Sequence, residues 1–198
     1  MCLLVESIKV SANKLWNIKY HNERMNRSRR LLFNCSDMID LEKEIKLPEN
    51  LTSGIYKSRV IYKERIISIE FIPYRKKEVR TLKVVHDDAI DYSFKFEDRS
   101  NIYKLIENIE TDDILIVKNG LVTDTSFSNV VFGDGEVLVT PATPLLKGTK
   151  RAKLLEEGII DEKEIHINDL KKYNRIYLIN CMIDLNDNNG IPIESVFL

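Results

Sequence analysis

The chain has 198 residues, 43% of them apolar and 31% charged, with a net charge of −1 at pH 7. This length supports one large domain or two small ones, and the near-neutral charge argues against binding to nucleic acid or to a membrane surface. The sequence has neither a basic signal-peptide start nor an apolar run of membrane-spanning length. Its three cysteines are odd in number and lack metal-type spacing. That usage is typical of reduced thiols, so we expect a cytoplasmic protein.

The first part of the chain has the β-branched and aromatic content that is typical of strands. Strands are predicted within residues 3–10, 11–18, 56–74 and 80–85, the third of these segments giving two strands or one bent strand. Helices are predicted over residues 20–34 and 40–47. This order predicts an antiparallel sheet with helices on one face, an α+β layer.

The second part of the chain begins near residue 86 and again mixes the two kinds of element. Amphipathic helices are predicted over residues 100–110 and 150–158. Strands are predicted over residues 113–120, 121–126, 129–133, 136–141, 164–167 and 175–183. We therefore expect two α/β lobes joined near residues 82–92, namely a small domain over 1–84 and a larger one over 85–198.

A candidate anion site lies where the segment TPLLKGTKRAKLLEEG turns into a helix. Thr149 is the predicted N-cap, and Lys150 lies at the positive end of the helix dipole. Main-chain N–H groups at such a helix start bind phosphate readily. The alternative is an ordinary junction between a loop and a helix.

A second candidate lies on the predicted helix of residues 20–34, in the segment YHNERMNRSRR. His21, Arg24 and Ser28 share one face at helical spacing, whereas Arg29 and its basic neighbours are expected to point to water. The alternatives are a solvated basic face with a structural histidine, or a nucleic-acid patch. The neutral net charge and the lack of interleaved aromatic residues disfavour the patch.

Lys95 and Asp124 are the two remaining candidates. Lys95 lies between Phe94 and Phe96, where partial desolvation would free its amine as a nucleophile, although such lysines commonly extend to solvent. Asp124 lies in the segment VTDTSFSN, whose hydroxyls could keep its carboxylate ionised, although such residues also form turns. A lysine, an acid, an arginine and a helix start are what pyridoxal 5′-phosphate requires for its aldehyde, its ring nitrogen and its phosphate.

Seven motifs stand in order along the chain: ESIKV, YHNERM, YSFKFEDR, LVTDTSFSNVVF, VLVTP, LLKGTKR and NCM. Their order and spacing resemble the class IV aminotransferases, the fold-type IV pyridoxal-phosphate enzymes, over most of the chain. That family includes branched-chain and D-amino acid aminotransferases and aminodeoxychorismate lyase. The resemblance implies a small N-terminal α/β domain, a larger pseudo-barrel α/β domain, the cofactor between them, and a homodimer.

The resemblance implies a role for each residue that matches a motif. Lys95 matches the lysine that forms a Schiff base with the cofactor and then moves the substrate α-proton. Asp124 stands where the family has a glutamate against the pyridine nitrogen, and it is one methylene shorter. The remaining matches are Arg24, Thr149 and Lys150 for the phosphate, and Ser126 and Ser128 for the pocket lining.

The reaction implied is transfer of an amino group between an amino acid and a 2-oxo acid. The position of an active-site tyrosine in many members falls near Val5, and Arg59 and Arg80 are candidates for binding a substrate carboxylate. Ordinary surface arginines are the alternative for both. The alternative reaction is a β-elimination like that of aminodeoxychorismate lyase, giving 4-aminobenzoate and pyruvate. A non-catalytic pyridoxal-phosphate binder is the option from another class, and an intact Lys95 and Asp124 argue against it.

Overall fold

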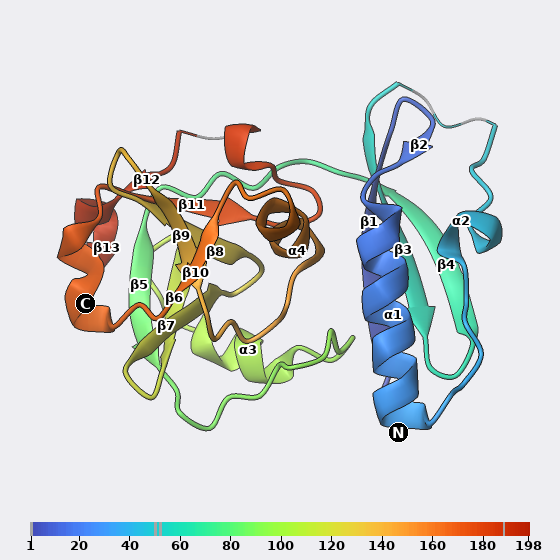
Figure 1. Ribbon diagram of the computed structural model, residues 1–198, viewed down its shortest axis with the longest axis horizontal. Helices are drawn as coiled ribbons and strands as arrows, with labels where there is room; N and C mark the ends of the chain where they lie inside the picture. Colours follow the sequence, from blue (N-terminus) through green and yellow to red (C-terminus); the bar gives the residue numbers. More distant parts are fainter. Residues whose placement is uncertain (1, 50, 52, 188) are drawn as a thin grey trace. The chain divides into compact units, whose positions relative to one another are not determined.

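The computed structural model describes residues 2–49, 51, 53–187 and 189–198. The chain forms two compact units, Met1–Lys76 with Phe94–Asp98, and Lys77–Ser93 with Arg99–Leu198 (Figure 1). The division expected after residue 84 therefore falls inside the second unit. Lys95 belongs to the first unit, because the chain returns to that unit for five residues before it continues.

The first unit is an antiparallel sheet in the order β2-β1-β3-β4, with helix α1 along one face (Figure 1). Its strands are β1 (Leu4–Ser11), β2 (Lys14–Leu15), β3 (Ile55–Tyr62) and β4 (Ile66–Pro73). Its helices are α1 (Ile18–Phe33) and α2 (Leu41–Glu44). The predicted antiparallel layer is confirmed, and residues 56–74 form two strands rather than one.

Alternation along β1 places Leu4, Ile8 and the carboxylate Glu6 on the face that α1 covers. Leu4 and Ile8 pack with Met25 of α1 and with Val60 of β3 in one fully buried cluster. Glu6 is likewise fully buried, so a carboxylate lies between the core residues Leu4 and Ile8 on the same face of β1.

The second unit is a nine-stranded sheet that contains both parallel and antiparallel pairs. Its strands are β5 (Leu82–His86), β6 (Asp113–Lys118), β7 (Leu121–Thr125), β8 (Asn129–Gly133), β9 (Leu138–Pro141), β10 (Asp161–Lys163), β11 (Arg175–Ile179), β12 (Ile191–Pro192) and β13 (Val196–Phe197). Its helical segments are α3 (Ser100–Leu105), α4 (Thr149–Glu156), and the 3-10 turns η1 (Ile167–Lys172), η2 (Leu185–Asp187) and η3 (Ile193–Ser195).

Strand β8 is the branch point of this sheet. It pairs along its whole length with β11, with β9 only at Phe132 and Gly133, and with β7 only at Asn129, which lies opposite Asp124. Strands β7 and β9 therefore diverge along β8. Asp124 and Asn129 lie at the point where β7 leaves it.

Several predicted elements differ from the structure. The strand predicted at residues 80–85 forms as β5, but it pairs in parallel with β6 in the second sheet rather than joining the first. No strand forms over residues 164–167, because the strand β10 ends at Lys163 and η1 begins at Ile167. Helices α2 and α3 are shorter than predicted, since each buries a single residue and little packing sustains further turns. In the described ranges, no helix is long and apolar enough to cross a bilayer.

Candidate functional site

Asp124 is a buried carboxyl near the end of β7, and only 5% of it is exposed. Its Oδ1 accepts a hydrogen bond from Asn129 Nδ2 at 2.7 Å, and its Oδ2 accepts one from the Leu146 N–H at 2.9 Å. Burial raises the pKa of Asp124 to about 6, although these hydrogen bonds and the charge of Arg151 act to lower it. The carboxyl therefore titrates close to neutrality inside the protein.

The polar segment after Asp124 forms a tight turn between β7 and β8. The Thr125 N–H donates to Ser128 O at 2.9 Å, and the Ser128 N–H donates to Thr125 Oγ1 at 3.1 Å. Ser126 and Ser128 are buried in this turn, and Asn180 Nδ2 donates to Ser128 Oγ at 2.9 Å. The turn-forming interpretation thus holds for Thr125. The expectation that hydroxyls hold Asp124 was wrong, since its side-chain and main-chain donors are Asn129 and Leu146.

The start of α4 lies beside this carboxyl, because Leu146 belongs to the loop that leads into the helix. Gly148 is the N-cap and Thr149 the first helical residue, so the prediction of Thr149 as N-cap was wrong by one position. Thr149 and Lys150 are both buried, and the Lys150 ammonium pairs with Asp184. The structure thus brings together Asp124, its turn and a helix N-terminus.

In the first unit, Glu6 joins two residues of α1 in a buried cluster. Arg24 donates to both carboxylate oxygens, from Nε at 2.8 Å and from Nη2 at 2.6 Å, and His21 Nδ1 lies 2.6 Å from Glu6 Oε2. Burial alone would raise the pKa of Glu6, but Arg24 and His21 lower it to about 2. Burial lowers the pKa of His21, which favours the neutral imidazole, although its contact with Glu6 acts in the opposite direction.

The predicted polar face of α1 is therefore real, but it is buried against β1 rather than solvated. Its alternative, a basic face in water, was wrong. Arg29 was also expected to face water, yet it is 1% exposed and pairs with Asp37 at 2.9 Å.

Lys95 lies in the returning segment Phe94–Asp98, which docks along the start of β1. The Val5 N–H donates to Lys95 O at 3.0 Å, and Phe96 forms a bridge with Leu4. Phe94 and Phe96 pack against the apolar core of the first unit, and Lys95 between them is half-buried. The charges of Arg24 and Lys95 add to burial in lowering the pKa of His21, so both cations act on the same buried imidazole.

The candidate arginines Arg59 and Arg80, and Arg99 four residues after Lys95, have partners within the protein. Arg59 of β3 donates to Glu97 at 2.7 Å and lies 3.6 Å from Glu70, so two carboxylates already surround it. Arg80 is exposed and pairs with Glu78. Arg99 donates to Ser126 O and lies over the Tyr103 ring.

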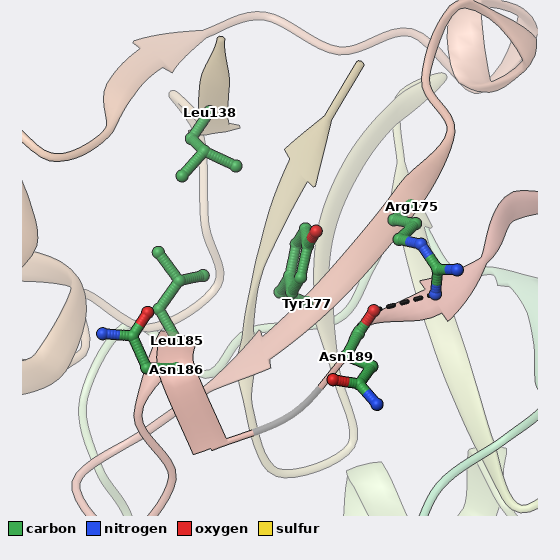
Figure 2. Close-up of a pocket in the computed structure, with 6 residues that line it drawn as sticks. All are labelled: Leu138, Arg175, Tyr177, Leu185, Asn186 and Asn189. Atoms are coloured by element: carbon green, nitrogen blue, oxygen red, sulfur yellow. Dashed lines mark hydrogen bonds between the residues drawn. The ribbon is translucent and has the colours of Figure 1, made fainter. Parts of the chain in front are cut away.

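A separate hollow of about 550 Å³ lies at the opposite end of β8, where Gly133 pairs with Arg175 (Figure 2). The residues that line it are Leu138, Arg175, Tyr177, Leu185, Asn186 and Asn189. Figure 2 shows Arg175 directed toward Asn189, whose carbonyl oxygen accepts a hydrogen bond from Nη1 at 2.8 Å. None of these lining residues belongs to the predicted site.

Sequence reasoning missed three residues that shape the site. Glu6 breaks the apolar positions of β1 between Leu4 and Ile8, and that break was a readable signal. Asn129 and Gly148 stand inside the motifs that contain Asp124 and Thr149, but their sequence context gave neither of them a role at the site.

The expected effect of pH on stability follows from the burial of Asp124. Its pKa is about 6 in the folded protein against 3.8 ordinarily, so between these values the folded state binds more protons than the unfolded state. The protonated Asp124 carboxyl therefore stabilises the folded state. This contribution to the free energy of unfolding, about 3 kcal/mol, is complete at low pH and is lost as pH rises through about 6. Denaturant titrations between pH 4 and pH 7 should show this slope as a difference between the wild-type chain and Asp124→Asn. An identical pH dependence in both proteins would contradict it.

The sequence and the fold were compared with those of known proteins. The sequence pattern described as amino-transferase class IV matches residues 104–186. An uncharacterized protein of Haemophilus influenzae is 38% identical over 182 residues, which cover 90% of this chain and 97% of that protein. A crystal structure from Haemophilus somnus, described as a proposed 4-amino-4-deoxychorismate lyase, is 37% identical with a TM-score of 0.83 and covers 92% of this chain and 97% of its own.

A more distant structure shares the fold. A hypothetical aminotransferase of Mycobacterium tuberculosis, solved with pyridoxal phosphate bound, has a TM-score of 0.78 at 16% identity, covering 98% of this chain and 81% of its own. The chain belongs to the class IV aminotransferase family and has the fold-type IV architecture. The family and the neighbouring structures are pyridoxal-phosphate-dependent enzymes.

Proposed function

We propose that the protein is a pyridoxal-phosphate-dependent aminotransferase that moves an amino group between an amino acid and a 2-oxo acid. The observation that carries the proposal is the buried Asp124 carboxyl, tied through Leu146 to the start of α4. In a chain of this family, a buried acid beside a helix N-terminus has the chemistry to hold the ring nitrogen and the phosphate of one cofactor.

The residues present fit the cofactor. Asp124 is ionised above about pH 6 and can hold a positive charge on the ring nitrogen. The start of α4 at Thr149 and Lys150 offers main-chain donors to a phosphate. Arg24, which Glu6 holds in place and whose side chain is 12% exposed, would donate a further hydrogen bond to it. Because Asp184 engages the Lys150 ammonium, Lys150 would contribute chiefly through its main chain.

Lys95 would attach the cofactor, and its freed amine would take the α-proton of the substrate. When bound, pyridoxal phosphate supplies a ring that takes up the charge left at the substrate α-carbon. Ser126 and Ser128, buried in the turn after Asp124, would line the cofactor pocket. Arg59 remains a candidate for the substrate carboxylate once Glu97 or Glu70 is displaced.

A second candidate is a lyase that releases 4-aminobenzoate and pyruvate from aminodeoxychorismate. The observation that favours it is the 37% identity, over nearly the full length, with the Haemophilus somnus protein. Lys95 and Asp124 would serve both reactions, because each reaction begins with loss of a proton from the substrate carbon that bears the amino group.

Two measurements test these proposals. Pyridoxal phosphate added to the purified chain should give a visible absorption band, and borohydride reduction followed by peptide mass spectrometry should place the label on Lys95. Pyruvate release from aminodeoxychorismate without any 2-oxo acid would favour the lyase, whereas amino transfer that requires a 2-oxo acid supports the aminotransferase. A chain that takes up no pyridoxal phosphate would overturn both.

A further inference from the structure

Asn129 is the first residue of β8, and it lies opposite Asp124 in the single residue pair that joins β7 to β8. Only 6% of Asn129 is exposed, so its amide must find hydrogen-bond partners inside the protein. This position places the amide directly beside the Asp124 carboxyl.

Both hydrogens of the Asn129 amide are used. Nδ2 donates to Asp124 Oδ1 at 2.7 Å and to Leu146 O at 2.8 Å. The Leu146 N–H in turn donates to the other oxygen of Asp124. Asp124, Asn129 and Leu146 thus form a closed set of three hydrogen bonds, which fixes the plane of the carboxylate.

The oxygen of the Asn129 amide accounts for the glycine at position 148, just before α4. A Cβ atom added at Gly148 would lie 1.9 Å from Asn129 Oδ1, and the nearest atoms to that Cβ all belong to Asn129. The Gly148 main chain has φ −71° and ψ 150°, a conformation open to any residue. Space for Asn129, rather than backbone conformation, therefore requires glycine here.

We propose that Asn129 is a positioning residue that orients the Asp124 carboxylate and keeps it ionised, and that Gly148 is glycine to make room for it. The hydrogen bond from Asn129 favours the charged form of the carboxyl, since a donated hydrogen bond stabilises an anion more than a neutral acid. Arg151 of α4, which is 3% exposed, is the charged group that acts in the same direction, together with main-chain donors at Leu145 and Leu146. The relevance to the cofactor rests on the proposed function.

The direct test is a ¹³C NMR titration of aspartate carboxyl groups in the full-length chain without pyridoxal phosphate, with Asp124→Asn identifying the signal. The wild-type midpoint is expected near pH 6. Asn129→Ala should raise it by about one to two pH units, because one donor to a buried anion is lost. An unchanged midpoint would overturn the proposal.

The matched control is Asn26→Ala in the first unit. Asn26 is 3% exposed, and its Nδ2 donates to Asn22 O and Ile39 O, so its loss also removes buried hydrogen bonds. This variant should lose stability without moving the Asp124 midpoint. If it moves the midpoint as far as Asn129→Ala does, the effect is general loosening and the positioning role fails.

Gly148→Ala gives a second, independent test. Alone it should displace the Asn129 amide and raise the Asp124 midpoint as Asn129→Ala does. In the Asn129→Ala background it should change neither the midpoint nor the stability further, because the atoms it would strike are gone. Equal effects in both backgrounds would overturn the proposal. If Asn129→Ala fails to fold, an unshifted midpoint in Gly148→Ala alone has the same meaning.

These outcomes separate the inference from the proposed function. A shifted midpoint in a chain whose wild type takes up no pyridoxal phosphate would support the positioning role and reject the enzyme. If the wild type binds pyridoxal phosphate at Lys95 but the variants leave the Asp124 midpoint unchanged, the enzyme proposal is supported and the positioning role is rejected. Where both hold, the absorption band of loaded Asn129→Ala should differ from wild type in its pH dependence, and not merely in intensity.

Discussion

The Lys95→Ala variant is expected to remain colourless after incubation with pyridoxal phosphate and gel filtration, and to lose turnover by at least about 10²–10⁴-fold. The amine at this position is both the proposed attachment point and the proposed carrier of the α-proton. The fold should survive, because the docking of this segment on β1 uses the main chain of Lys95 and the rings of Phe94 and Phe96. Circular dichroism and the absorption spectrum check the two statements separately.

Lys118→Ala is the matched control for this experiment. Lys118 is also half-buried, and its ammonium donates to Ile90 O at 2.6 Å, so its removal alters a comparable contact in the second unit. Labelling and turnover in this variant should equal those of the wild type. Borohydride-stable label that persists in Lys95→Ala at the wild-type level would show that another lysine carries the cofactor.

The Glu6→Ala variant is expected to destabilise the first unit by about 3–5 kcal/mol, because removing one partner of a buried ion pair leaves the other charge uncompensated. Arg24 would lose both of its hydrogen bonds to the Glu6 carboxylate, and His21 would lose its acceptor. Denaturant unfolding followed at Trp16, which lies in the first unit, measures the loss.

A double-mutant cycle decides whether the ion pair is the cause. Arg24→Met in the Glu6→Ala background should restore part of the lost stability, since the orphaned guanidinium is then absent. A further loss that simply adds to the first would show that packing, rather than charge pairing, controls this cluster.

Acid should act on the same cluster with a definite sign. The pKa of Glu6 is lowered to about 2 from 4.5, so its stabilising contribution is complete above about pH 5 and is lost as pH falls toward 2. Glu6→Gln should flatten this part of the unfolding curve. Because the shift of Asp124 has the opposite direction, acid weakens the first unit while it favours the second.

The strands and the long helix could be predicted because their signals are local. β-Branched and aromatic content marked β1 and β3, and helical spacing placed His21 and Arg24 on one face of α1. Pairing partners were not local, and for this reason β5 was assigned to the wrong sheet. The length of a helix such as α3 depends on what it packs against, which no local pattern contains.

The candidate site could be predicted only as far as its motifs. Motif order selected Lys95, Arg24 and Asp124, because each has a chemical type that the cofactor requires. Their partners could not be predicted, because the contacts are not local. Arg24 meets Glu6 across 18 residues of sequence, and Asp124 meets Asn129 across a strand pair. Gly148 is explained by an atom 19 residues earlier in the chain, and no pattern within the helix start could have signalled it.

The order in which the chain is synthesised gives the segment Phe94–Asp98 a further consequence. The polypeptide passes between the units at residues 76–77, 93–94 and 98–99, so the first unit lacks its segment Phe94–Asp98 until β5 has already been synthesised. A break after residue 76 would separate the β1 docking edge from Lys95 on a different fragment. Fragments 1–76 and 77–198 should therefore accept pyridoxal phosphate at Lys95 only when mixed, which would make the colour a reporter of their reassembly.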